Sequence, residues 1–431
     1  MRLSDPPARS YYAASAPAVQ SVAPPRMPLE GEHRADVCVV GAGIAGLSTA
    51  LHLAKRGYSV AVLEARHVGY GASGRSGGQT IFGLAASQQK LIGLVGRADA
   101  HRLFDLTVEA LDLTQSLIRE HAIDCDYRPN HLHVAIKARH QAELEAWWHE
   151  LHDEYGYDSV HLLDRDALQA HVTSERYIGG LLDTRSGHLH PLKFTQGLAH
   201  AAETAGVRIF EDSPALEYHD GREVRVRTPR GELRAGHLVL CGNAYLGSLA
   251  PTLARRILGV GTYIIGTEPL DPQRARSLMP SNAAVSDINW VLDYFRLSAD
   301  HRVLFGGRVS YSTVEPPRLA QSMRRRMLRV FPGLADIAVD YAWGGYVDIT
   351  LSRATDFGRL APNVYYMQGF SGHGMVLTAL GGKLVAEALA GTVERFDVFA
   401  RIPHRDFPGG PLFRRPSLVL AMMVYRLRDL L

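Results

Sequence analysis

The chain has 431 residues, of which 46% are hydrophobic and 21% are charged, and its formal net charge is +3. This length exceeds what one hydrophobic core usually organises, so two domains are expected. The small net charge argues against nucleic-acid binding. The densest basic stretch, residues 323–330 (MRRRMLRV), is typical of the solvated face of a helix.

The N-terminal segment, residues 1–30, is rich in proline and alanine and lacks the continuous apolar stretch of a signal peptide. We expect an extended arm that Tyr11 and Tyr12 can dock. The three cysteines are too few for a disulfide framework, and Cys38 and Cys241 fall in apolar runs that predict buried strands. A reducing compartment, the cytoplasm, is therefore expected.

Residues 35–65 predict a compact βαβ unit. An apolar strand (35–40) leads into a helix (46–57), and a second apolar strand follows at 59–65. Between the first strand and the helix, residues 41–46 read Gly-Ala-Gly-Ile-Ala-Gly, and Glu64 stands 18 positions after the last of these glycines. A glycine turn between a strand and a helix, with an acidic residue ending the next strand, is the pattern of a dinucleotide site.

The rest of the chain alternates between α/β segments and strand-rich segments. Helical patterns run to about residue 121, strands follow from 124, a helix and a strand occupy 191–212, and strand signals return at 260–310. This order predicts an α/β (α+β overall) fold in which a Rossmann-type nucleotide domain (31–125, 186–250 and 345–400) is interrupted by a mainly β substrate domain (126–185 and 251–344). A tail helix is expected over 401–431.

Two further glycine-rich stretches favour FAD over NAD. One is the loop 69–80 (GYGASGRSGGQT), and the other is residues 369–374 (GFSGHG), which open a second helix at 374–389. A nicotinamide enzyme rarely needs either. A second helix N-terminus would place its positive end near the flavin ring and stabilise negative charge on the reduced flavin.

These motifs together resemble the D-amino acid oxidase-type FAD oxidoreductases, which include glycine and sarcosine oxidases. More narrowly, residues 10–15 (SYYAAS), 71–79, 126–129 (DYRP), 241–247 (CGNAYLG), 365–374 and 394–410 resemble the γ-glutamylputrescine oxidoreductases of bacterial polyamine catabolism. The resemblance implies oxidative deamination of an amine, most simply γ-glutamylputrescine, to an aldehyde with release of ammonia, and with peroxide where O2 is the electron acceptor. The alternatives are the same chemistry on an amino or imino acid, a flavin-binding protein without turnover, and FAD-dependent modification of RNA.

The residues predicted to contact FAD lie in the glycine segments and at the acidic position. They are Gly41, Ala42, Gly43, Ile44, Ala45, Gly46, Glu64, Ala65, Ser73, Gly74, Arg75, Gly77, Gly78, Gln79, Gly372, His373, Gly374 and Met375. The resemblance further implies non-covalent FAD. Gly344 stands where sarcosine oxidases have a tethering cysteine, and Arg75 stands where dimethylglycine-type enzymes have a tethering histidine.

Four residues are candidates for the reaction itself. Tyr346 would form an aromatic wall over the flavin, His373 would sit at its edge, and Gln79 would hydrogen-bond the ring. Arg308, like Arg353, could bind a substrate carboxylate. Each also has an ordinary structural interpretation as a strand, turn or surface residue.

Leu304 takes the place of an oxygen-activating lysine of sarcosine oxidases, so the electron acceptor is left open between O2 and a quinone or carrier.

The twenty histidines include two HLH pairs (131–133 and 188–190), whose rings would share one face in a strand. No third ligand accompanies either pair, so no metal is expected. The apolar tail 416–431 is too short to span a membrane and suggests a packed helix, with peripheral membrane contact or a subunit interface as alternatives.

Overall fold

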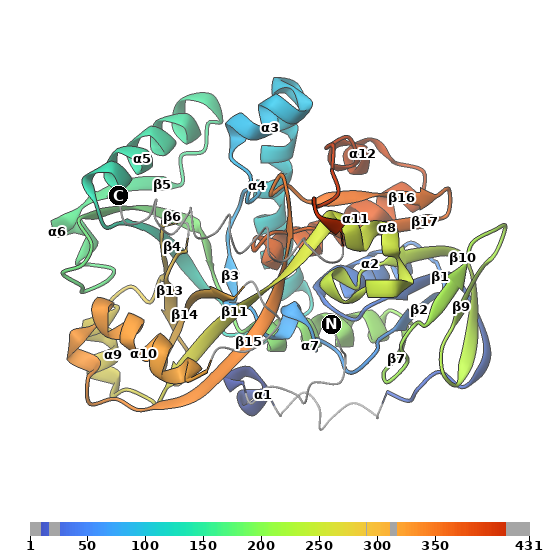
Figure 1. Ribbon diagram of the computed structural model, residues 1–431, viewed down its shortest axis with the longest axis horizontal. Coiled ribbons are helices and arrows are strands. Elements are labelled where there is room, and N and C mark those ends of the chain that lie inside the picture. Colours follow the sequence, from blue (N-terminus) through green and yellow to red (C-terminus); the bar gives the residue numbers. More distant parts are fainter. Residues whose placement is uncertain (1–9, 17–25, 290, 311–316, 411–431) are drawn as a thin grey trace.

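The computed structural model describes residues 10–16, 26–289, 291–310 and 317–410, with the side chains of 308–310 excepted. Two sheets divide the molecule, one at each end in the view of Figure 1. Eight strands form the first sheet: β1 (Gly31–Val40), β2 (Val60–Leu63), β7 (Arg208–Phe210), β8 (Glu217–His219), β9 (Val224–Arg227), β10 (Gly231–Leu240), β16 (Asp356–Ala361) and β17 (Val364–Gln368).

Nine strands form the second sheet. They are β3 (Gln79–Thr80), β4 (Arg128–Ala135), β5 (Val160–Asp164), β6 (Gly179–His188), β11 (Ile257–Thr267), β12 (Ala284–Asp287), β13 (Tyr294–Leu297), β14 (Val303–Ser310) and β15 (Val339–Thr350).

Twelve α-helices are formed by the described residues. They are α1 (Tyr11–Ser15), α2 (Ile44–Ala54), α3 (Gln88–Val95), α4 (Arg97–Glu120), α5 (Ala138–His149), α6 (Arg165–Leu168), α7 (Pro191–Thr204), α8 (Pro251–Arg256), α9 (Pro272–Leu278), α10 (Leu319–Val330), α11 (Gly374–Leu389) and α12 (Glu394–Ala400). None of these helices is long and apolar enough to cross a membrane.

The first sheet has the order β16-β17-β10-β1-β2-β7, and β17, β10, β1, β2 and β7 run parallel. Its apolar strand residues face two cores. Val37, Val39, Val60 and Val62 pack with α2, α7 and α11, while alternate residues such as Cys38 and Leu63 pack on the opposite face. This is the doubly covered parallel sheet expected of the βαβ pattern, and the predicted Rossmann-type α/β fold is confirmed.

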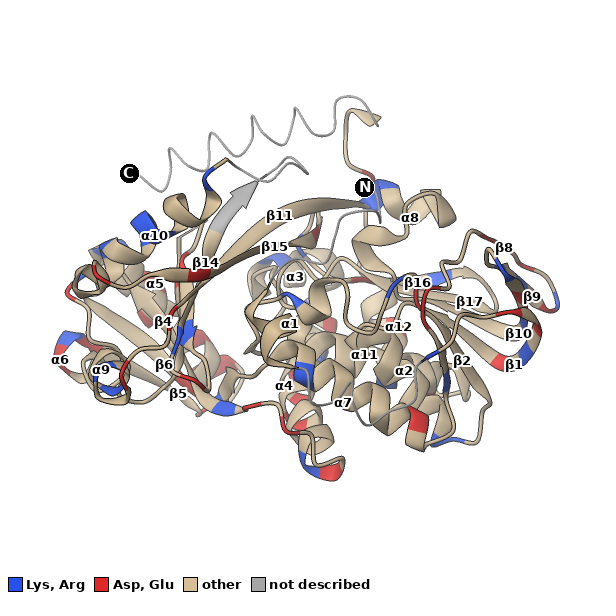
Figure 2. Ribbon diagram, turned by 90° about the horizontal axis from the view of Figure 1, so that it is seen from below, with Lys and Arg blue, Asp and Glu red and all other residues tan. Residues whose placement is uncertain are grey.

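The second sheet is mixed and mostly antiparallel, and α10 packs against its strands β11, β14 and β15. The basic stretch at 323–330 lies in α10, whose buried residues Leu319, Met323, Met327 and Val330 recur at helical spacing. The arginines between them lie on the remaining faces of the helix, as the pattern predicted. Figure 2 shows basic and acidic residues interspersed over both halves of the described chain.

The domain boundaries stay a prediction, although the distribution of strands supports them. Strands within 126–185 and 251–344 belong to the second sheet, and those within 31–65, 208–240 and 356–368 belong to the first. Three strands mark where the chain passes between them: β3 and β6 carry residues of the expected nucleotide segments into the second sheet, and β15 spans the expected boundary at 344. Of the expected arm, residues 11–15 form the helix α1, and residues 411–431 of the expected tail lie outside the described residues.

Candidate functional site

The two glycine turns identified in the sequence leave the same edge of the first sheet. Val40 of β1 pairs with Leu240 of β10, which pairs with Tyr366 of β17, so the carboxyl ends of three parallel strands are in register. The turn after β1 and the turn after β17 are therefore two strands apart, about 10 Å. The helices that follow them pack together, since the Ser48 hydroxyl of α2 donates to the Ala379 carbonyl of α11 at 2.6 Å.

Two glycines of the first turn, Gly43 and Gly46, lie too close to neighbouring atoms to be replaced by a residue with a side chain. A Cβ at Gly46 would lie 1.9 Å from the Gly41 carbonyl oxygen, and a Cβ at Gly43 would lie 2.8 Å from the Ser73 hydroxyl. Gly41 has φ +106°, which disfavours any other residue. Gly43 is the N-cap of α2 and offers no side chain to its amides, so the backbone at this helix start can approach a diphosphate.

Glu64 closes the same edge, directly after β2. Its carboxylate accepts from the Ala42 amide at 2.8 Å and from the Arg66 amide at 2.9 Å. Burial raises its pKa, and the bonds from these two amides oppose that shift. A carboxylate has more acceptor sites than these two bonds use, so Glu64 retains capacity for ribose hydroxyls. Ala65 beside it is half-buried.

The loop 69–80 connects the two helix starts. The Ser73 hydroxyl accepts from the amide of Ile44, the first residue of α2, at 3.0 Å. Three positions later, the Ser76 hydroxyl approaches the sulfur of Met375, the second residue of α11, at 3.7 Å. One loop thus contacts both sites that the sequence assigned to a single cofactor.

The second turn is held by a buried carboxyl from the other sheet, which sequence reasoning missed. Asp348 of β15 is 2% exposed, and its carboxylate accepts from the Gly369 amide. Its backbone carbonyl accepts from the Ser371 amide at 2.9 Å. Burial raises the pKa of Asp348 to about 7, although the bond from Gly369 opposes this. The only available signal was an acidic residue in an apolar strand.

His373 is the N-cap of α11, and its side chain makes no capping bond. Its Nδ1 is buried and has no hydrogen-bond partner among the described residues. Burial lowers the pKa of His373 to about 4, and the positive charge of Arg353 lowers it further. The imidazole is therefore neutral at pH 7, and one buried nitrogen remains available to a ligand.

Tyr346 and Arg75 each lie against an aromatic ring. The ring of Tyr346 lies 6.3 Å from that of Tyr245, edge to face, and the Arg75 guanidinium lies 4.5 Å from the centre of the Tyr70 ring. A Cβ at Gly344 would lie 2.9 Å from the Tyr263 ring. A side chain at the position of the tethering cysteine would therefore require that ring to move.

The remaining candidates are spread along the second sheet. Gln79 lies in β3 rather than in a free loop, and its amide nitrogen donates to the Val285 carbonyl at 3.4 Å. Arg308 belongs to β14, and its side chain lies outside the described residues. Leu304 is buried in a cluster with Tyr12 and Trp343.

The first histidine pair lies on one face of β4, as predicted, with the rings of His131 and His133 4.5 Å apart. The prediction is wrong for the second pair, because β6 ends at His188 and His190 is the N-cap of α7. Proline at 191 starts the helix directly after His190, so His190 serves as a helix cap instead of a strand residue. Among the described residues, no group of three potential ligands could hold a metal ion.

Two helix starts whose N-cap residues make no side-chain capping bond, glycines where a Cβ would clash, and an acidic residue beside them are the features of a dinucleotide site on a Rossmann-type sheet. Residues 36–388 match the family model described as FAD dependent oxidoreductase (DAO), and the chain belongs to this family. It is thus an FAD-dependent oxidoreductase.

The chain is similar to full-length relatives. It is 43% identical to the gamma-glutamylputrescine oxidoreductase of Escherichia coli (strain K12) over 421 residues, which covers 97% of this chain and 98% of the relative. It is 40% identical to a probable oxidoreductase, OrdL, of Haemophilus influenzae, over 93% of this chain and 94% of that one. Among solved structures, glycine oxidase from Bacillus cereus matches with a TM-score of 0.71 at 20% identity, covering 86% of this chain and 99% of that one.

Proposed function

We propose that this protein catalyses the oxidative deamination of γ-glutamylputrescine at its free amine: loss of two electrons gives an imine, and water hydrolyses the imine to γ-glutamyl-aminobutyraldehyde and ammonia. The observation that carries the proposal is the 43% identity to the gamma-glutamylputrescine oxidoreductase of Escherichia coli over almost the whole of both chains. The compartment we propose is the cytoplasm, and the three buried cysteines without disulfides are compatible with it.

FAD, when bound, accepts the two electrons that leave the carbon bearing the amine. We propose that the α2 start and Glu64 hold its diphosphate and ribose, and that the loop 69–80 and the α11 start hold its ring, without a covalent bond. The crowding of Gly344 against Tyr263 supports non-covalent binding.

The side chains at the ring end would orient the substrate and control its protonation. A primary ammonium has a pKa near ~10, so oxidation requires that the site favour the neutral amine. Because burial lowers the pKa of His373 to about 4, its imidazole is neutral at pH 7. It can then hydrogen-bond the substrate amine without adding a charge of its own to the site. Tyr346 would orient the amine over the ring, and Gln79 would hydrogen-bond the ring. Arg308 is our candidate for the distant carboxylate.

A second candidate is oxidation of an amino or imino acid by the same site. The observation that favours it is Arg353, whose charge acts on His373. An arginine at that position would fix a carboxylate adjacent to the reacting C–N bond, whereas γ-glutamylputrescine carries its carboxylate far from the amine.

With either substrate, O2, a quinone or a protein carrier would reoxidise the flavin, and peroxide would form where the acceptor is O2.

The deciding experiment is anaerobic mixing of the flavin-loaded protein with γ-glutamylputrescine, putrescine and pipecolate in parallel, following loss of flavin absorbance near ~450 nm. Rapid bleaching by γ-glutamylputrescine alone is expected. Bleaching by pipecolate alone would favour the second candidate, and bleaching by none of the three would contradict both. Admission of air then reports whether O2 reoxidises the flavin.

A further inference from the structure

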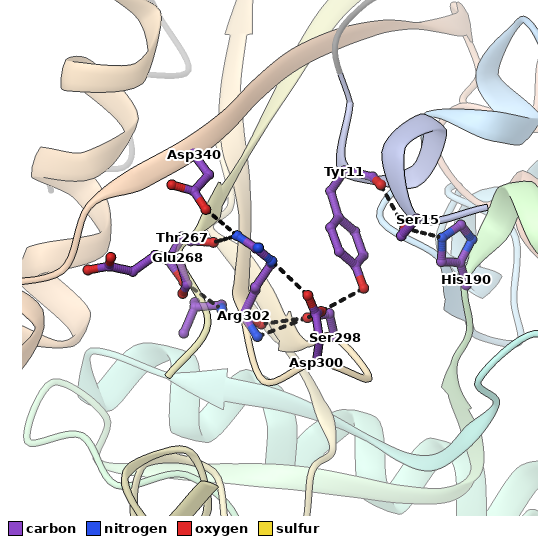
Figure 3. A network of polar contacts seen from close by, with 10 residues as sticks. Tyr11, Ser15, His190, Thr267, Glu268, Ser298, Asp300, Arg302 and Asp340 are labelled. Atoms are coloured by element: carbon purple, nitrogen blue, oxygen red, sulfur yellow. Dashed lines mark hydrogen bonds and ion pairs between the residues drawn. The ribbon is translucent and has the colours of Figure 1, made fainter. Parts of the chain in front are cut away.

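The helix α1, residues 11–15, packs against the second sheet through two adjacent tyrosines whose hydroxyls have different hydrogen-bond partners. Tyr11 donates its hydroxyl to Asp300 at 2.7 Å, as Figure 3 shows. Tyr12 is fully buried, with its ring 5.2 Å from Trp343 and 4.8 Å from His190. Its hydroxyl accepts a hydrogen bond from Arg296 at 3.1 Å.

Arg296 is a buried guanidinium without a counter-charge among the described residues. It is 3% exposed, and its hydrogen-bond partners are the carbonyls of Gly77, Leu189 and Leu297, the Tyr12 hydroxyl and His188. All of these are neutral, since burial lowers the pKa of His188 to about 3. A buried charge is tolerated only where its hydrogen bonds are made, so each partner matters.

Two of the residues that Tyr12 contacts, Arg296 and Trp343, also hold the glycine loop. Arg296 donates from Nε to the Gly77 carbonyl at 2.9 Å, and Trp343 donates from its indole to the Arg75 carbonyl at 3.1 Å. These two carbonyls lie on either side of Ser76, the residue that reaches Met375 at the start of α11. Tyr12 therefore packs behind the segment of the loop that faces the second helix start.

We propose that Tyr12 is a positioning residue of the FAD site: it fixes Arg296 and Trp343, which hold residues 75–77 in the conformation that receives the flavin. Helix α1 would then support the cofactor site through the two residues that hold the loop. The proposal rests on FAD binding and not on the identity of the amine.

Tyr12→Phe and Tyr11→Phe are matched variants for its test. Each removes one hydroxyl from a buried ring of the same helix, and only the first loses the bond to Arg296. The apoprotein of each variant is titrated with FAD. We expect the dissociation constant to rise about tenfold for Tyr12→Phe, the effect of one hydrogen bond to a charged group, and less than twofold for Tyr11→Phe.

A second readout needs no cofactor. Arg75 is a trypsin site within the loop, and cleavage after it reports how firmly the loop is held. Tyr12→Phe should accelerate this cleavage in the apoprotein at least threefold, and Tyr11→Phe should leave it unchanged. A double variant with Arg296→Lys tests the route: once the arginine fork is lost, Tyr12→Phe should add nothing further to the FAD dissociation constant.

Equal changes in the two single variants would overturn the proposal, because α1 would then act only as a general stabiliser. Unchanged FAD binding in Tyr12→Phe would overturn it as well, and so would additive effects in the double variant. The comparison of the two single variants decides the matter by itself if Arg296→Lys does not fold.

Discussion

The starts of α2 and α11 lie at the same sheet edge, yet they are built in different ways. At α2 most of the contacts come from one βαβ unit and the loop after it: Gly41, Gly46, Glu64 and Ser73 lie within one stretch of 33 residues, although the Cys241 carbonyl after β10 crowds Gly41. At α11 the turn depends on Asp348 from the second sheet. The first start is therefore a local motif, and the second is a tertiary contact between the two halves of the molecule.

This difference predicts that steric crowding decides the effect of substituting a glycine in the turn before α2. Gly46→Ala places a Cβ 1.9 Å from the Gly41 carbonyl, which is backbone and cannot swing away. We expect a loss of about 3 kcal/mol or more in the free energy of unfolding, and at least a hundredfold loss in FAD affinity. Urea unfolding and FAD titration of the apoprotein measure the two effects. Near-normal affinity would contradict the assignment of this turn to the diphosphate.

Lowering the pH should destabilise the protein mainly through buried histidines that lie outside the turn before α2. Burial lowers the pKa of His52 and His373 to about 4, and that of His133, His188 and His190 to about 3, from 6.5. The unfolded chain then binds more protons below pH 6.5, so stability falls as the pH drops from about 6.5 toward 4.

Buried carboxyls oppose this trend, Asp287 and Asp348 among them. Burial raises the pKa of Asp287 to about 6 and of Asp348 to about 7, so their contribution is full at low pH and is lost as the pH rises through those values. The histidines with lowered pKa values outweigh these carboxyls, and we expect a net loss of stability between pH 7.5 and pH 5. Urea midpoints at the two pH values measure it; equal midpoints would show that these histidines are solvated.

Substitution of Asp348 tests the tertiary contact at the start of α11 without altering the residues of the turn before α2. Asp348→Ala leaves the Gly369 amide without its acceptor, and we expect about 2 kcal/mol of destabilisation and roughly tenfold weaker FAD binding. Asp348→Asn keeps an acceptor oxygen and is the matched control, with a change of under about 1 kcal/mol. If alanine and asparagine behave alike, the turn does not depend on this bond.

Gly372→Ala should have the smallest effect. No atom lies within 4 Å of a Cβ at this position, so crowding is absent among the described residues, but its φ of +99° is strained for alanine. We expect about 1 kcal/mol of destabilisation with FAD affinity reduced less than tenfold. The ratio of its effect to that of Gly46→Ala, measured in the same titration, distinguishes strain from collision.

The prediction of the fold from sequence succeeded where patterns were long and periodic. The buried strands β1 and β2, the helix α2 and the strand-turn-helix at 364–389 all appear where apolar runs and glycines indicated them. The failures fall where a neighbouring element decides the local structure. His190 was expected in a strand but caps α7, and Gln79 was expected in a loop but pairs with His188 as β3.

The sequence by itself determined the dinucleotide-binding class of this protein, because the turn after β1 is a local motif: backbone sterics require its glycines, and Glu64 accepts a hydrogen bond from the Ala42 amide within it. It could not reveal that Asp348 holds the second turn, or that Tyr12 and Arg296 support the glycine loop. Those contacts join different elements of the fold: Asp348 of β15 reaches the turn after β17, and Tyr12 of α1 reaches Arg296 of β13, 284 positions away. Only strand register and the packing of the two sheets decide which of many buried polar residues meet.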